Sequence, residues 1–148
     1  MNLGNEEKIR KMKMEFIAGK GYTLKNIKKT DYIFTFSAVL FSEKFVNNIG
    51  ETLKEEMQFF PCKVICNDTT LDWYAAKITH QFPIIDEEMS EYYNSDGEKV
   101  LDFAKFRTNI EDKFYIARDY KEITEFVVSD LFKNLCEENE LKLDFKEL

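Results

Sequence analysis

Hydrophobic residues follow two patterns in the first half of the chain. The segment "DYIFTFSAVLF" (31–41) is dense in aromatic and β-branched residues, which predicts a strand region. Ser42 follows it and begins a helix that is predicted to reach about Met57. The apolar stripe of this helix repeats every four residues: Phe45, Ile49, Leu53 and Met57.

Two apolar runs in the middle of the chain predict a β-hairpin. The segments "FFPCKVIC" (59–66) and "LDWYAAKIT" (71–79) have strand composition, and the "NDTT" between them has the composition of a turn. Pro61 has no amide hydrogen to donate, so we expect its strand to be an edge at that point or to begin near it.

The second half of the chain predicts further strands and one more helix. A polar connection over 82–99, with a short helix at 86–93, comes first. Three segments then have strand composition: 100–106, 114–120 and 123–129. Ser129 begins a helix to about Asn139, and 142–148 is predicted to form a final short strand. This order predicts an α+β fold of mostly antiparallel sheet with about three helices.

The N-terminal segment predicts a basic amphipathic helix over 5–18. Ile9, Met12, Phe16 and Ile17 share one face of this helix, and its polar face is rich in lysine. No low-complexity linker divides the chain. We therefore predict a single domain over 1–148, in which the basic helix lies within 1–20 and an α+β core covers 31–148.

Two segments of the sequence begin in the same way. "FSEKFVNNI" and "VSDLFKNLC" each place a serine, an acidic residue and a phenylalanine at matching positions, with Ser42 and Ser129 87 residues apart. Serine is a preferred helix N-cap, and an acidic residue in the first turn suits the helix dipole. Neither serine has the flanking glycines of a nucleophile elbow. We interpret both as structural caps whose phenylalanines, Phe45 and Phe132, fix the helices to a sheet. The parallel favours a duplicated strand-Ser-helix-strand element.

Composition and charge indicate in which cellular compartment the protein works and what kind of partner it binds. Three cysteines, the lack of a membrane-length apolar run and the lack of a signal peptide predict a cytoplasmic protein with reduced thiols. The net charge is −7, but residues 1–30 carry +5, so the rest of the chain carries −12. An acidic body repels nucleic acid and attracts basic partners. We expect neither nucleic-acid nor membrane binding.

Residues that could carry chemistry are few. His80 is the only histidine, and the sequence places no carboxylate beside it, so a surface or loop position is its default interpretation. Cys62 and Cys66 lie on the same face of a predicted strand, and Cys136 lies on the apolar face of a predicted helix. We therefore expect all three to be core residues. Phosphate-binding glycine motifs and calcium loops are absent. We expect no cofactor, no metal and no catalysis.

Several short segments occur in an order that is similar to that of a known protein family. "FVVSDLFKNLCEENELKLDF" (126–145) runs from a strand through V-S-D into an acidic helix, and "KFYIARDY" (113–120) is an aromatic strand that ends near Arg118. Upstream lie "FSEKFVNNI", "QFFPCKVI" and "YAAKITHQFPIIDEEMSEY". Together they resemble the immunity protein 11-like family of bacterial polymorphic-toxin systems. The resemblance covers about 31–148 and departs from the family at Leu143, where the family has glycine.

The resemblance implies a non-catalytic protein that binds and neutralises a cognate toxin. We add the hypothesis that the toxin has a basic surface. The expected binding surface is an acidic, aromatic segment, for which a solvated loop is the alternative: Asp86, Glu87, Glu88, Glu91, Tyr92, Tyr93 and Asp96. Two other functions stay open, namely a small cytosolic enzyme that uses His80 with a carboxylate, and an oligomerising or structural binding module. Homo-oligomerisation also stays open.

Overall fold

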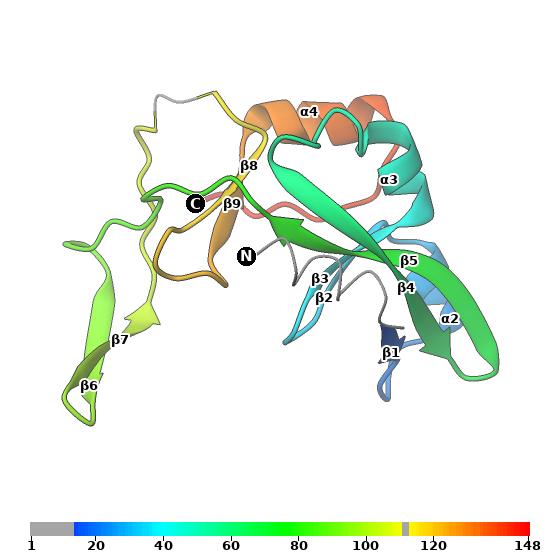
Figure 1. Ribbon diagram of the computed structural model, residues 1–148, viewed down its shortest axis with the longest axis horizontal. Helices are drawn as coiled ribbons and strands as arrows, with labels where there is room; N and C mark the ends of the chain where they lie inside the picture. Colours follow the sequence, from blue (N-terminus) through cyan, green and yellow to red (C-terminus); the bar gives the residue numbers. More distant parts are fainter. Residues whose placement is uncertain (1–13, 111–112) are drawn as a thin grey trace, which may run out of the picture.

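The computed structural model describes residues 14–110 and 113–148 (Figure 1). Most of the helix predicted over 5–18 lies outside these residues. Its described end is a strand instead, β1 (Glu15–Ile17), which pairs in parallel with β4 (Met57–Cys66). The amide of Lys63 donates to the carbonyl of Met14 at 2.9 Å. The prediction was wrong here because Phe16 fits the apolar position of a short edge strand as well as that of a helix.

The main sheet has five strands in the order β1-β4-β5-β3-β2. The predicted hairpin of β4 and β5 (Thr69–Ile78) is confirmed, and Asn67 supplies the positive φ of 53° that its short turn needs. In the described chain β4 pairs with β1 only over 63–65, so Pro61 lies where this flank of β4 has no partner strand, as predicted. The segment 31–41 forms β2 (Tyr32–Phe34) and most of β3 (Val39–Ser42).

Helices cover both faces of this sheet (Figure 1). The short helix α2 (Leu24–Lys28), which the sequence did not predict, buries Ile27 against one face. The other face packs against α3 (Glu43–Ile49) and α4 (Asp130–Glu138). The four apolar positions predicted as one stripe, Phe45, Ile49, Leu53 and Met57, are all buried, but only Phe45 and Ile49 lie within α3.

The helix predicted from Ser42 to Met57 is shorter than expected. It ends at Ile49, and residues 50–56 form turns before β4 begins. Gly50 lies at this boundary, where an added Cβ would come within 2.5 Å of the carbonyl oxygen of Val46. The amide of Leu53 still reaches the carbonyl of Ile49 at 3.2 Å, so the turns keep the stripe buried while the chain changes direction.

A second, small sheet precedes α4. It pairs β8 (Ile116–Arg118) with β9 (Phe126–Val128). The strand predicted at 142–148 does not form. The backbone of Lys142 bonds instead to Asp31, whose amide donates to the Lys142 carbonyl at 3.0 Å and whose carboxylate accepts from the Lys142 amide at 2.7 Å. Both serine-led segments are therefore strand-Ser-helix units, but only the first continues into a strand.

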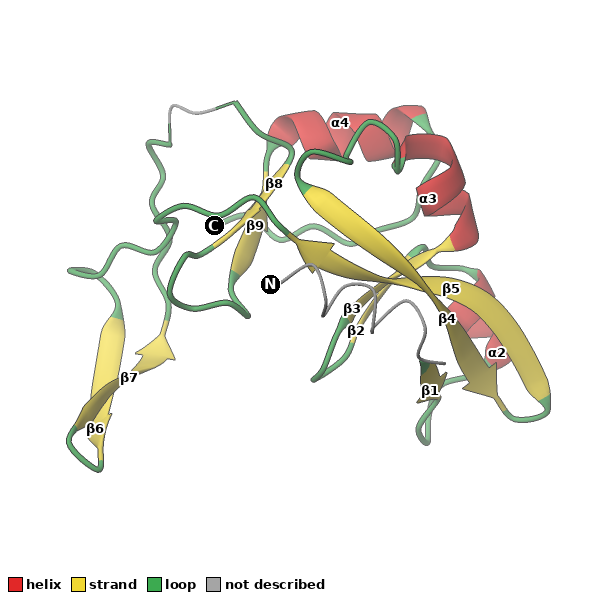
Figure 2. Ribbon diagram, viewed as in Figure 1, coloured by secondary structure: helices red, strands yellow, loops and turns green. Residues whose placement is uncertain are grey.

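A hairpin replaces the polar connection and short helix predicted over 82–99. It consists of β6 (Glu91–Ser95) and β7 (Glu98–Phe103), and we call it the arm, residues 91–103. Asp96 and Gly97 have φ values of 50° and 83°, as a two-residue hairpin turn requires. Figure 2 shows the arm projecting away from the rest of the molecule. A third group of buried residues lies at its base: Ile84, Ile85 and Ala117.

These elements confirm the predicted fold class. Across residues 14–110 and 113–148 there are three helices and nine strands, and every strand pair except that of β1 with β4 is antiparallel. The architecture is α+β.

Candidate functional site

Ser42 and Ser129 are the N-caps of α3 and α4. The Ser42 hydroxyl accepts from the Phe45 amide at 3.0 Å and donates to the buried carboxylate of Asp31 at 2.5 Å. The Ser129 hydroxyl accepts from the Phe132 amide at 3.3 Å and donates to the carbonyl of Phe114. Each hydroxyl is engaged in holding backbone and core together, which is a structural role.

The acidic residues that the sequence singled out do not form one cluster. Asp86 is part of the arm's base, because its carboxylate accepts from the amides of Glu88 and Met89, both at 3.1 Å. Glu87 pairs with Lys121 at 2.7 Å. Glu88 and Glu91 are exposed, and Asp96 forms the exposed turn at the arm's tip.

The two tyrosines proposed as anchors point to opposite faces of the arm. Successive residues of a strand alternate in direction, and Tyr92 is opposite Leu101 while Tyr93 is opposite Val100. Tyr92 faces inward, where the ammonium of Lys99 lies 4.0 Å from its ring centre. Tyr93 faces outward and is 51% exposed. Of these two tyrosines, Tyr93 is therefore the one whose ring is accessible to a partner.

The outward face of the arm combines this tyrosine with carboxylates. Register places Tyr93 and Val100 on the same face as Glu98 and Asp102, which flank Val100 at two residues' distance on β7. Both acidic side chains are exposed, and no ion pair is found for either in the described chain. This face is an exposed aromatic ring bordered by unpaired negative charge.

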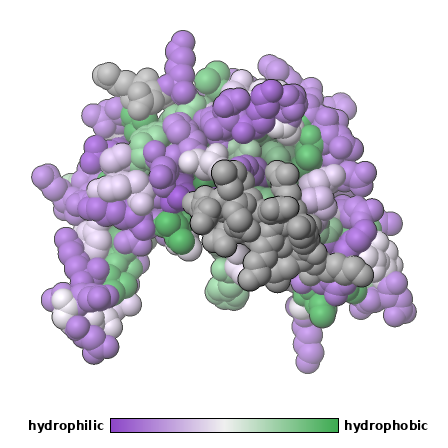
Figure 3. Space-filling model, viewed as in Figure 1, coloured by the Kyte–Doolittle hydropathy of each residue, from purple (hydrophilic) through white to green (hydrophobic). Residues whose placement is uncertain are grey.

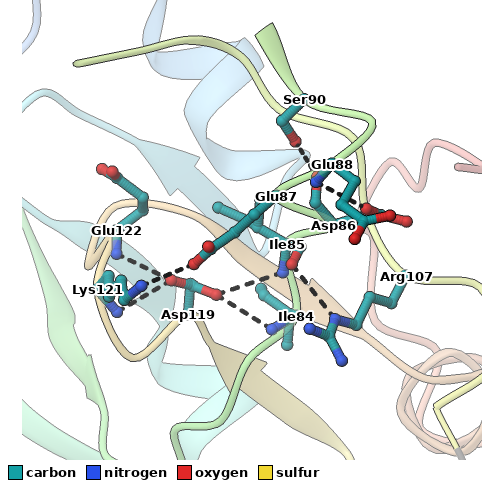
Figure 4. A network of polar contacts seen from close by, with 10 residues as sticks. All are labelled: Ile84, Ile85, Asp86, Glu87, Glu88, Ser90, Arg107, Asp119, Lys121 and Glu122. Carbon is teal, nitrogen blue, oxygen red and sulfur yellow. Dashed lines mark hydrogen bonds and ion pairs between the residues drawn. The ribbon is translucent and has the colours of Figure 1, made fainter. Parts of the chain in front are cut away.

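Asp119, which the sequence analysis missed, anchors the arm's base (Figure 4). Its side chain is 3% exposed. One carboxylate oxygen accepts from the amides of Ile84 and Ile85 at 3.1 and 3.3 Å, and the other from those of Lys121 and Glu122 at 2.9 and 3.0 Å. Burial alone would raise the pKa of Asp119, but these four backbone donors outweigh it and lower the pKa below its usual value.

A small hollow of about 160 Å³ lies between the arm's inner face and this anchor. Its lining carries charges of both signs: Ile85, Glu87, Tyr92, Lys99, Asp119, Lys121 and Glu122. The hydrogen bond from Lys121 lowers the pKa of Glu87, and the same bond raises the pKa of Lys121. Because the opposite charges here satisfy one another, the hollow offers little net charge to a ligand.

His80 has a carboxylate neighbour that the sequence could not place. Its Nδ1 lies 3.1 Å from Glu56 Oε1 and 3.2 Å from the carbonyl oxygen of Ile116. Both neighbours are acceptors, so Nδ1 carries a hydrogen, and Nε2 is an acceptor in the neutral form of the ring. The rings of Phe82 and Phe114 pack against the imidazole with centroids 5.2 and 6.0 Å away.

The surroundings of this pair favour a structural role. Both oxygens of Glu56 accept from the Tyr115 amide at 3.0 Å, so the carboxylate joins the start of β4 to the start of β8. His80 is one-third exposed. It lines neither the small hollow nor a larger groove of about 790 Å³ between β9 and the C-terminal segment.

Cysteines and acidic groups form no metal site in the part of the chain that the structure describes. Cys62, Cys66 and Cys136 are all buried and unpaired. Burial raises the pKa of Cys62 to about 11 and that of Cys136 to about 12. These are core thiols, as the sequence predicted for their positions.

Comparison with known proteins gives no match to a family model, to a curated protein or to a solved structure. Within residues 14–110 and 113–148, no helix has the length and apolar character needed to cross a membrane.

Proposed function

We propose that this chain is a non-catalytic immunity protein that acts in the cytoplasm by binding and neutralising a cognate bacterial toxin. The order of segments that resembles the immunity protein 11-like family supports this proposal. The observation that carries it is the outward face of the arm, where Tyr93 is exposed among the carboxylates of Glu98 and Asp102. Tyrosine surrounded by polar groups is a typical anchor of protein interfaces.

The distribution of charge supports a basic partner. Residues 86–105 contain seven acidic and two basic side chains, so this segment carries −5 of the chain's net −7. The arm and its base therefore concentrate negative charge on a projecting element. Such a field accelerates association with a basic surface and weakens as salt screens it.

The test uses the toxin domain encoded beside this gene. Co-expression should protect cells from the toxin, and the purified proteins should bind one another. A charge-reversed arm, Glu98→Lys with Asp102→Lys and Tyr93→Ser, should bind at least about 30-fold more weakly, as the loss of an interface hot spot implies. Glu137→Lys with Glu138→Lys on α4 is the control, since it reverses two exposed charges elsewhere. Failure of the wild-type protein to bind or protect would overturn the proposal.

One observation favours a second candidate function, a small enzyme that uses His80. The hydrogen bond from Nδ1 to Glu56 orients the ring with Nε2 as an acceptor, which is the arrangement of a general base supported by a carboxylate. His80→Asn separates the two functions. A non-catalytic protein should protect cells as well with this substitution as without it, whereas an enzyme should lose protection even when the folded protein is present at equal amounts.

A further inference from the structure

The turn between β2 and β3 presents two phenylalanines to solvent. Phe34 is 58% exposed and Phe36 is fully exposed. We call residues 34–38 the aromatic tip. Side chains this exposed bury little apolar area on folding, and two of them on one tight turn offer apolar surface for contact with a partner.

The aromatic tip is held in a fixed shape. The Thr35 hydroxyl donates to the Ala38 carbonyl at 2.8 Å and accepts from the amides of Ser37 and Ala38 at 3.3 and 2.9 Å. The Thr35 amide also donates to the Ala38 carbonyl at 2.9 Å. A turn closed by its own side chain loses little conformational freedom when it binds, so its phenylalanines are presented ready for contact.

The aromatic tip and the arm project to the same side of the molecule. In Figure 1 the β2–β3 turn and the β6–β7 hairpin both extend toward the lower edge of the view. Figure 3 shows an apolar projection at the position of the β2–β3 turn, separated by a hollowed surface from the mainly hydrophilic arm. Both elements therefore face a partner that approaches from this side.

We propose that the aromatic tip is a second contact site for the same basic protein partner, which would insert Phe34 and Phe36 into an apolar pocket beside its basic surface. The negative charge of residues 86–105 favours a basic protein over the other possible partners of the aromatic tip. An anionic membrane would be repelled by the −5 segment that faces the same side. A second copy that met tip to tip would bring two acidic arms together. A basic protein gains binding free energy from the acidic arm and from the aromatic tip.

This inference rests on the proposed function, and one experiment separates the two. The probe is the purified, catalytically inactivated toxin domain from the neighbouring gene. Affinity is measured for the wild-type protein, for Phe34→Ser with Phe36→Ser, and for Phe36→Ser alone, which tests the site even where the double variant is less well folded. The control is Leu131→Ser, which removes a half-exposed apolar side chain from α4, on the side of the molecule opposite the arm and the aromatic tip (Figure 1).

We expect the double variant to bind about 10- to 100-fold more weakly, with Phe36→Ser accounting for most of the loss and Leu131→Ser unchanged. Wild-type binding with no loss in either tip variant would overturn this inference and leave the proposed function intact. No wild-type binding would overturn both. Tip-dependent sedimentation with phosphatidylserine vesicles, or a tip-dependent dimer mass in light scattering, would assign the aromatic tip to a membrane or to a second copy and overturn the inference.

Discussion

The rings of Phe45 and Phe132 meet in the core with centroids 6.1 Å apart and planes inclined by 45°. Each lies three residues after the serine that caps its helix. The two serine-led segments, 87 residues apart in sequence, therefore converge at one point and join α3 to α4. Their similarity reflects how two helices begin and pack.

The contact between Phe45 and Phe132 predicts a measurable interaction free energy between the two side chains. Phe45→Leu, Phe132→Leu and the double variant form a cycle that isolates the ring–ring interaction, for which aromatic pairs give about 0.5–1.5 kcal/mol. Urea unfolding measures each free energy. Phe36→Leu, at a fully exposed site, should change stability by no more than about 0.5 kcal/mol. Additive effects of the two core substitutions would show that the rings do not interact energetically.

The two capping serines should differ in their contribution to stability. Ser42→Ala removes a cap and also the hydroxyl donor of the buried Asp31, so the cost should be about 2–4 kcal/mol. Ser129→Ala removes a cap and a bond to a backbone carbonyl, at about 1–2 kcal/mol. Urea denaturation of both variants tests the order. Equal costs would mean that the bond to Asp31 adds nothing to the cap.

The Asp119 anchor predicts a pH-dependent effect. Asp119→Asn replaces a carboxylate that accepts four backbone hydrogens, and should cost about 2–4 kcal/mol at pH 7. The folded-state pKa lies below the unfolded value of about 3.9, so the carboxylate's contribution is present above about pH 4 and is lost as pH falls through the folded pKa. The difference between wild type and variant should therefore shrink below pH 4. A constant difference would contradict this account.

The buried thiols should be unreactive in the folded protein. Cys62 and Cys136 have pKa values raised to about 11 and about 12 by burial, and Cys66 is also buried. With Ellman's reagent at pH 8, the native protein should react only at the rate of its unfolding, and the urea-unfolded protein should release one equivalent per cysteine at once. A fast phase in the native protein would show an accessible thiol.

The sequence predicted those helices and strands that are determined by residues close to one another along the chain. The β4–β5 hairpin follows from two dense β runs around Asn67 and Asp68, and both helix starts follow from their serine caps. β7 overlaps the strand predicted at 100–106, but the hairpin was missed because its apolar residues come in adjacent pairs, Tyr92–Tyr93 and Val100–Leu101, which hides the alternation of a half-buried strand. The dipeptide Asp96–Gly97 was the available signal for its turn.

Most of the features that the sequence did not predict depend on contacts between residues far apart along the chain. Asp119 meets amide groups 34 and 35 residues away, and no pattern near Asp119 indicates them. Likewise, Lys142 bonds to Asp31 across 111 residues, which draws the C-terminal segment away from a strand ladder. The predicted acidic surface was divided for the same reason, since Glu87 pairs with Lys121 from another hairpin.

The most direct test of the proposed function is the affinity of the wild-type protein and the charge-reversed arm for the inactivated toxin domain, measured at low and at physiological salt. We expect tight wild-type binding that weakens with salt, and a loss of at least about 30-fold for Glu98→Lys with Asp102→Lys and Tyr93→Ser. The α4 control, Glu137→Lys with Glu138→Lys, should bind like wild type. Equal affinity of the arm variant and the wild-type protein, or no binding by either, would contradict the account.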